Sequence, residues 1–154
     1  RPLFQGHKTA KSLLEAGIST TLIADSAAES FVIGRGSVSI GAVFIGCDQL
    51  TTKGYCVNKI GSWGIAMSAY HASKPLYVVS PLLKVDPQIG GDELKIEVRE
   101  SRELWEDAPK ELKIFNPAFE IVDNSLITGI LTEFGILKPK EIAEVVKAKY
   151  PWLF

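Results

Sequence analysis

The chain has few cysteines and no long hydrophobic run. Cys47 and Cys56 are its only two cysteines, and they have neither the density of a disulfide-stapled fold nor the spacing of a structural zinc site. No segment reaches the ~18 apolar residues that a membrane span requires. Residues 1–6 also lack the charged-then-apolar layout of a secretory signal. We therefore expect no metal, no membrane and a reducing compartment, the cytoplasm.

The chain also lacks an excess of charge of either sign. Lys and Arg together number 17 and Asp and Glu together 18, and the isoelectric point is about 6.2. Proteins that bind nucleic acid or anionic membranes through their overall field carry a positive excess. We therefore predict no direct binding of nucleic acid, although one or two local cations are enough to hold a small anion.

What remains is the composition of an ordinary globular domain. Of the 154 residues, 46% are hydrophobic and 23% are charged. A folded chain of this size buries about 70% of the surface that its unfolded form exposes, so it can build a core without staples. We predict a single domain over residues 1–154. Because the sequence lacks an initiator Met and opens on a polar segment, we expect it to be part of a longer protein.

The first half of the sequence alternates helical and strand-like patterns. The patterns predict helices over residues 9–16, 25–31 and 65–73, and strands over residues 18–24, 38–46 and 76–80, with a polar loop over residues 49–59. This alternation is typical of βαβ units, and mostly apolar strands are typical of a parallel sheet covered on both faces. The predicted fold class is α/β, Rossmann-like and doubly wound, with a mainly parallel sheet and helices on both faces.

The second half is less regular. Residues 94–98 alternate like a half-exposed strand, and the charged residues 99–113 indicate an exposed excursion. Apolar spacing predicts helices over residues 126–134 and 140–149. Because the apolar faces of these helices precede an aromatic tail, residues 150–154, we predict a two-fold dimer through these elements; packing within one chain is the alternative.

Ligands of open α/β sheets bind beyond the carboxyl ends of the strands, where Asp25, Asp48, Ser80 and Lys84 follow predicted strands. Asp25 precedes Ser26 and is more typical of a helix cap. Asp48 follows the most apolar strand and has no helix directly after it, so we expect partial desolvation, which suits acid–base work. Helix capping, the ordinary role of a lone Asp after a strand, remains the alternative.

Residues 58–62 are the second candidate. Asn58, Lys59, Gly61 and Ser62 combine an amide, an ammonium group, a permissive backbone and a helix start, which together suit a phosphate. The segment is neither a Walker A loop nor a Gly-x-Gly-x-x-Gly fingerprint, and a capped helix with a surface lysine explains it equally well. Cys47, at the end of an apolar strand, is interpreted as a small buried hydrophobe rather than a nucleophile.

Several motifs occur together in an order that a known superfamily shares. They are Arg-Pro-Leu-Phe-Gln-Gly-His-Lys-Thr-Ala at 1–10, Gly-Cys-Asp at 46–48, Gly-Tyr-Cys-Val-Asn-Lys-Ile-Gly-Ser at 54–62, residues 75–80, Asn-Pro-Ala-Phe at 116–119, and Leu-Ile-Thr-Gly-Ile-Leu-Thr-Glu-Phe-Gly at 126–135. The chain resembles the C-terminal domain of the superfamily that contains the alpha, beta and delta subunits of translation initiation factor 2B, methylthioribose-1-phosphate isomerase and archaeal ribose-1,5-bisphosphate isomerase. In that family an N-terminal helical domain comes first.

The resemblance implies a set of site residues and no cofactor. Asp48 falls on the catalytic Asp of the isomerases. Gln5, Asn58 and Lys59 fall on positions that hold the sugar phosphate, and Lys84 falls on a further binding lysine of the bisphosphate isomerase. The catalytic partner of the Asp is a Cys in a motif upstream of this chain, and Cys47 stands where the family pattern usually has Ala.

The resemblance leaves three functions open. The beta and delta subunits typically lose the Asp and the Asn-Lys pair, so the presence of Asp48, Asn58 and Lys59 favours an isomerase, with methionine salvage as its context. The alpha subunit keeps the Asn-Lys pair and typically replaces the Asp. The alternatives are a regulatory subunit that binds initiation factor 2 and an inactive domain that chiefly dimerises.

Overall fold

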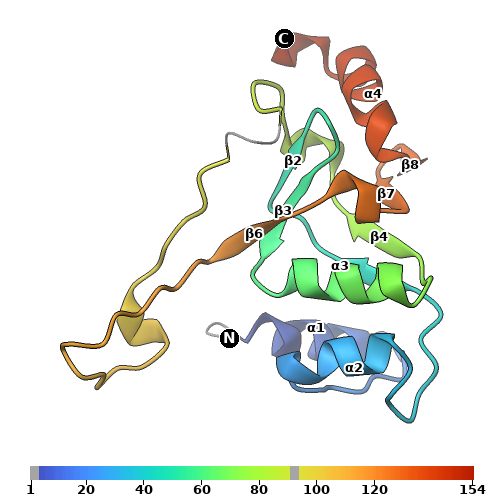
Figure 1. Cartoon of the computed structure of the whole chain (residues 1–154). Coiled ribbons are helices and arrows are strands. Elements are labelled where there is room, and N and C mark those ends of the chain that lie inside the picture. The colour runs from blue at the N-terminus through green and yellow to red at the C-terminus, as the bar shows by residue number, and fades with distance from the viewer. Residues whose placement is uncertain (1–3, 91–93) are drawn as a thin grey trace.

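A computed structural model describes residues 4–90 and 94–154. Its α-helices are α1 (Gln5–Glu15), α2 (Ala28–Val32), α3 (Ser62–His71) and α4 (Ile142–Lys149), and its strands are β1 (Val43–Ile45), β2 (Gln49–Thr51), β3 (Cys56–Lys59), β4 (Leu76–Val79), β5 (Val85–Asp86), β6 (Phe119–Val122), β7 (Gly129–Thr132) and β8 (Gly135–Leu137). Short 3-10 turns join several of them (Figure 1). None of the described helices is long and apolar enough to cross a membrane.

The strands form two sheets. In the first, β1, β4 and β7 are parallel neighbours and β8 is added antiparallel, giving the order β1-β4-β7-β8. In the second, the order is β5-β2-β3-β6, and only the pair of β5 and β2 is parallel. The α/β class is therefore confirmed, with a parallel centre smaller than the sequence predicts and an antiparallel sheet beside it.

The core is one cluster to which both sheets and the helices α2, α3 and α4 contribute. Leu76, Val78 and Ile130 have no exposed surface, and each such side chain contributes roughly 1.5–3 kcal/mol through burial. Ala66 and Ala69 of α3 are also fully buried, which lets this helix pack close to the strands. α2 packs on α3, and Figure 1 shows α1 and α2 together below it.

The opposite face of the first sheet is exposed. Phe44 is 59% exposed, Val79 50% and Ile136 62%, and the rings of Phe44 and Tyr77 stack with centroids 5.5 Å apart. The sequence predicts helices on both faces, but in the described part of the chain this apolar face is uncovered. A large exposed apolar patch is typical of a surface that another chain or segment covers.

Three predicted elements in the first half differ from the structure. The strand predicted over residues 38–46 is reduced to β1, residues 43–45. Residues 18–24 form no strand, because no neighbouring strand pairs with them and their side chains are mostly exposed. The predicted loop over residues 49–59 instead contains the antiparallel pair β2 and β3. Leu50 and Cys56 face each other in that pair and are fully buried, and their burial stabilises the hairpin. The polar residues of the turn make the segment look like a loop in the sequence.

The predicted helix over residues 126–134 is wrong. The segment is a 3-10 turn (Asn124–Leu126) followed by β7, whose two edges bond to β4 and β8. Pairing on both edges overrides the helical spacing of the apolar residues, since a short apolar run fits either structure. The last predicted helix is confirmed as α4, preceded by a 3-10 turn (Pro139–Glu141).

The charged excursion is confirmed. Residues 94–118 form an extended arm that projects from the body (Figure 1), and most side chains between residues 99 and 113 are exposed. The strand predicted over residues 94–98 is reduced to a single bridge between Val98 and Pro117. Arg99 and Glu103 join at 2.6 and 2.7 Å on this arm.

Candidate functional site

Asp48 lies just beyond the carboxyl end of β1. Its backbone N–H donates to the Val57 carbonyl at 2.8 Å, which fixes the chain beside β3 before β2 begins. The Asp48 side chain is exposed, so the partial desolvation predicted from the apolar strand is not present in the described residues. The carboxylate is thus positioned by its backbone and open to a ligand.

Lys84 approaches the same strand end from another element. It closes the 3-10 turn Leu82–Lys84, and its ammonium group donates to the carbonyl oxygen of Cys47, the residue before Asp48. Lys84 also lines a shallow cavity with Gln49 and Asp86, which are hydrogen-bonded to each other at 3.0 Å. The cation predicted at this position is therefore held next to the Asp48 backbone.

Asn58 and Lys59 end β3 and lead into α3. The Asn58 amide donates to the Ser62 hydroxyl at 2.9 Å, and Ser62 donates to the Lys59 carbonyl at 2.7 Å. Between them, Gly61 adopts φ +103°, a backbone conformation that side chains other than glycine rarely take. These bonds fix the strand-to-helix turn and leave the side-chain oxygen Oδ1 of Asn58 facing Gly46, 3.6 Å from where a Cβ on that residue would lie.

The Lys59 side chain is held by β6. Antiparallel pairing places Phe119 opposite Lys59, and the ammonium nitrogen lies 4.1 Å from the centroid of the Phe119 ring. A cation over an aromatic face is stabilised by about 0.5–2 kcal/mol. Phe119 was not identified from the sequence as a site residue, although the Asn-Pro-Ala-Phe motif contains it.

The start of α3 differs from the phosphate site that the sequence suggests. Glu120 accepts a hydrogen bond from the Trp63 backbone N–H at 2.8 Å, and Asp123 accepts one from the Trp63 indole at 2.9 Å. A carboxylate of the chain itself therefore uses part of the helix N-terminus. The ammonium group of Lys59, rather than the backbone amides at the start of α3, is therefore the group that can bind an anion.

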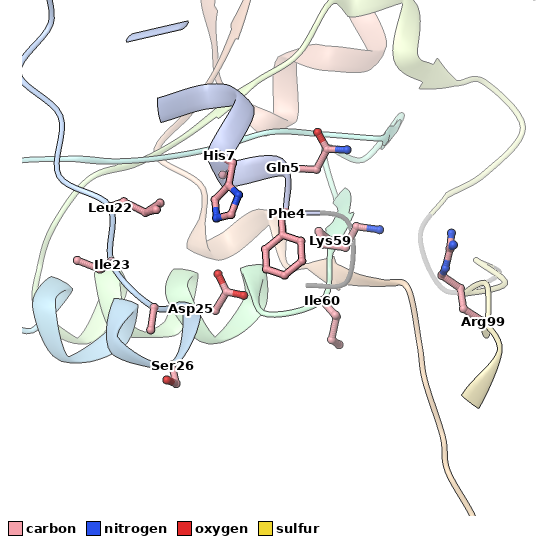
Figure 2. Close-up of a pocket in the computed structure, with 12 residues that line it drawn as sticks. Phe4, Gln5, His7, Leu22, Ile23, Asp25, Ser26, Lys59, Ile60 and Arg99 are labelled. Atoms are coloured by element: carbon pink, nitrogen blue, oxygen red, sulfur yellow. The ribbon is translucent and has the colours of Figure 1, made fainter. Parts of the chain in front are cut away.

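Lys59 and Gln5 line one cavity of about 570 Å³. Phe4 and His7, whose rings stack at 4.9 Å, contribute its wall from the start of α1, and Arg99 reaches it from the arm. Figure 2 shows Phe4, His7 and Asp25 gathered in the middle, with Gln5 and Lys59 to one side. Phe4, His7 and Arg99 were not predicted as site residues, although the motif at residues 1–10 contains Phe4 and His7.

The predicted residues fall into two neighbouring groups. Gln5 and Lys59 share the large cavity, whereas Asp48 and Lys84 lie around Cys47 at the end of β1. Asn58 borders both groups, because its chain neighbour is Lys59 and its side-chain oxygen lies 3.6 Å from the position that a Cβ on Gly46 would occupy. Lys59 therefore belongs to one group, and Lys84 belongs to the other together with the exposed Asp48.

The pair Cys47 and Cys56 adds an electrostatic feature that the sequence did not reveal. A hydrogen bond from the Cys56 thiol lowers the pKa of Cys47, and Ser80 and the charge of Lys84 lower it further, against burial and Asp48. The same contact with Cys47, with burial, raises the pKa of Cys56. The pKa of Cys47 is therefore lowered and that of Cys56 raised relative to an ordinary thiol.

The chain is similar to known sugar-phosphate isomerases. It is 42% identical over 147 residues to methylthioribose-1-phosphate isomerase from Symbiobacterium thermophilum, a match that covers 90% of this chain and 40% of that protein. It is 38% identical to 5-deoxyribose 1-phosphate isomerase from Moorella thermoacetica, covering 96% of this chain and 43% of that protein. The chain thus spans about two-fifths of the length of these relatives.

Solved structures show the same fold. Methylthioribose 1-phosphate isomerase from Pyrococcus horikoshii matches with a TM-score of 0.83 and 30% identity, over 96% of this chain and 43% of that one. The delta subunit of translation initiation factor eIF-2B from A. fulgidus matches with a TM-score of 0.81 and 33% identity, over 96% and 44%. The sequence profile of the initiation factor 2 subunit family matches residues 1–139. The chain therefore belongs to the initiation factor 2 subunit family, as its motifs suggest.

Proposed function

We propose that this chain is the C-terminal domain of an aldose–ketose isomerase that acts on methylthioribose 1-phosphate or a closely similar pentose 1-phosphate. The observation that carries the proposal is the exposed carboxylate of Asp48 at the end of β1, with Lys84 bonded to the adjacent carbonyl. The isomerase names of the relatives support the substrate class. In this reading the chain alone is inactive, because the family's catalytic Cys lies upstream.

Each predicted residue has a role in this reaction. Lys59 and Lys84 attract the phosphate by charge, while Asn58 and Gln5 donate or accept hydrogen bonds with the phosphate and the sugar hydroxyls. Asp48 moves a proton at a sugar hydroxyl while a hydrogen passes between adjacent sugar carbons. A general acid–base group of this kind contributes typically 10²–10⁴-fold to the rate. No metal and no cofactor is needed for this division of work.

A second candidate is a regulatory subunit that binds initiation factor 2. The similarity to the solved eIF-2B delta subunit favours it, since the TM-scores of the two kinds of relative are nearly equal. The presence of Asp48 together with Asn58 and Lys59 favours the isomerase, because a subunit that only binds a protein needs no carboxylate at the strand end.

The two functions are separated by assaying the full-length protein that contains this chain. Purified protein is mixed with methylthioribose 1-phosphate and, separately, with ribose 1,5-bisphosphate, and ketose formation is followed. The same protein, tagged, is tested for co-purification with initiation factor 2. Turnover of either substrate supports the isomerase. Absence of turnover together with co-purification overturns it in favour of the regulatory subunit.

A further inference from the structure

The arm formed by residues 94–118 carries large apolar side chains into solvent. It projects from the body of the molecule (Figure 1). Four apolar side chains of its outer part are about half exposed or more: Leu104 (55%), Trp105 (54%), Leu112 (48%) and Phe115 (74%). Loops longer than about 12–15 residues are uncommon in compact domains and are usually either functional or disordered. The contacts within the arm distinguish these two cases.

Polar contacts of its own order the stem of the arm. The backbone N–H of Arg99 donates to the carbonyl oxygen of Asn116 at 2.8 Å. The buried side chain of Asn116 donates to the carbonyl oxygen of Glu100 at 3.1 Å, and the Arg99 guanidinium group grips Glu103. These bonds join the two sides of the arm without a hydrophobic core. The arm is therefore preorganised, which lowers the entropy that it would lose on binding a partner.

The charges of the arm do not single out a charged partner. Cations and anions alternate between residues 99 and 113, and several are paired within the arm, Arg99 with Glu103 and Arg102 with Glu100. Such a surface has no basic excess for nucleic acid. Its distinguishing groups are Trp105 and Phe115, because Trp and Phe are enriched in the cores of protein interfaces. The arm therefore suits a partner with an apolar surface.

The stem of the arm lies beside the start of α1. Arg99 lines the same cavity as Phe4 and Gln5. This chain spans about two-fifths of the length of its isomerase relatives, so most of a protein of that length would lie outside it. At the C-terminal position proposed above, this additional polypeptide enters through residue 4, next to the arm. The tail, residues 150–154, lies at the other end of the molecule (Figure 1), so a copy bound to the tail would not cover the arm.

We propose that the outer part of the arm, residues 102–115, docks onto the polypeptide that precedes this chain in the full-length protein, with Trp105 and Phe115 as its apolar anchors. A covalently joined partner is present at an effective concentration of the order of millimolar, which favours it over a second copy. The docking rests on the C-terminal position that we propose for the chain, and it does not depend on catalysis.

Docking at this place would add a wall to the proposed substrate cavity. Arg99 borders that cavity from the arm, and in Figure 2 Lys59 lies between Phe4 and Arg99. Polypeptide that is held by the arm and leads into α1 would therefore lie at the rim of the cavity. This consequence, unlike the docking itself, rests on the proposed isomerase function.

The test places a photoreactive side chain on the arm of the full-length protein. Phe115 is replaced by p-benzoyl-L-phenylalanine, an aromatic side chain, and the dilute protein is irradiated. We expect a cross-linked product at the mass of one polypeptide on a denaturing gel, in which mass spectrometry finds residue 115 joined to a peptide from upstream of residue 1. A product of twice that mass would overturn the proposal in favour of a second copy. Absence of a link, or links confined to residues 1–154, would also overturn it.

A pair of variants tests the anchor. Docking protects the arm from trypsin, so cleavage after Lys110 and Lys113 follows the fraction of undocked arm. Trp105→Ser should raise the cleavage rate about tenfold or more, the loss expected of an aromatic anchor. Glu106→Ser, a change at the neighbouring exposed residue, should stay within about twofold of wild type. Equal rates for wild type and both variants would contradict the docking.

The outcome for the docking is separate from the outcome for the isomerase. If the full-length protein turns over no sugar phosphate, the proposed isomerase function fails, and the cross-link and the cleavage rates still decide whether the arm docks. If the cross-link falls elsewhere while the protein turns over methylthioribose 1-phosphate, the docking fails and the isomerase function stands.

Discussion

Lys59 is the residue whose surroundings most directly suit an anion. Its ammonium group lies over the Phe119 ring and borders the 570 Å³ cavity, so it is held in place without a carboxylate partner in the described contacts. Lys59→Met should raise the KM for the sugar phosphate by roughly 10–100-fold, the loss of one charge-assisted hydrogen bond of about 1.5–3 kcal/mol. Steady-state kinetics of the full-length protein measure it.

A matched control is Lys8→Met. Lys8 lies exposed on α1 and outside the cavity, so this change removes the same charge from the protein without touching the site. Its KM should stay near that of wild type. Equal increases in KM for both variants would mean that overall charge, rather than Lys59, attracts the substrate.

Glu133 makes a pH-dependent contact near the C-terminus. Desolvation opposes its ionisation, but hydrogen bonds from Tyr150 at 2.7 Å and from the Leu82 amide at 2.9 Å outweigh it and hold the pKa of Glu133 below its ordinary 4.5. A lowered folded pKa stabilises the fold fully above pH 4.5, and this stabilisation is lost as the pH falls through the folded pKa. Tyr150→Phe should therefore lower Tm at neutral pH.

The Tm difference between wild type and Tyr150→Phe should shrink as the pH falls below 4.5. It should also shrink at strongly alkaline pH, because the carboxylate of Glu133 raises the pKa of Tyr150 above its ordinary 10.0. The group is exposed, so the effect is small. Thermal melts over a pH series measure it, and a Tm difference that does not change with pH would contradict the ionised contact.

At the scale of elements, the β2–β3 hairpin joins the two groups of site residues, and Gly54 closes its turn with φ +78°. A Cβ on Gly54 would lie 2.6 Å from Pro139, whereas one on Gly17, at φ +75°, would meet nothing within 4 Å. Gly17→Ala should cost only the left-handed backbone penalty of roughly 1–2 kcal/mol. Gly54→Ala should cost more, and urea unfolding of both variants measures the difference. Equal losses in the free energy of unfolding for the two variants would mean that the hairpin shifts to make room for the added Cβ.

The helices and strands also show which parts of the fold the sequence alone predicts. Helices α1, α3 and α4 and strand β4 follow from periodicity and from Gly and Pro boundaries. Residues 126–134 do not, because their apolar spacing fits a helix as well as a strand and only pairing on both edges decides between them. Tertiary pairing likewise creates the hairpin and leaves residues 18–24 unpaired.

Some residues of the candidate site could likewise be predicted from the sequence, and others could not. Asp48 and Lys84 could be placed from their positions after apolar strands, and motif resemblance supplied Gln5, Asn58 and Lys59. The roles of Phe119 beside Lys59 and of Arg99 at the cavity depend on packing between segments far apart in the chain.

At the scale of the whole molecule, part of the surface through which the sequence predicts a dimer is buried within the chain. Ile130, Ile142 and Val146 are fully buried in their own chain and cannot form an interface. The tail leaves Trp152 70% and Phe154 55% exposed. Dimerisation through the tail remains a prediction: light scattering should give a dimer for the full-length protein, and Trp152→Ser should weaken it. A monomer at high concentration would contradict it.

The central claim is that Asp48 performs acid–base catalysis on a sugar phosphate, and the most direct measurement is kcat for methylthioribose 1-phosphate with full-length wild type and Asp48→Asn. The amide keeps the shape of the carboxylate but cannot accept the proton, so kcat should fall by at least 10²–10⁴-fold. Tm should barely change, because the Asp48 side chain is exposed and its backbone bond to Val57 is retained. An Asp48→Asn variant that folds and keeps the wild-type kcat would contradict the claim.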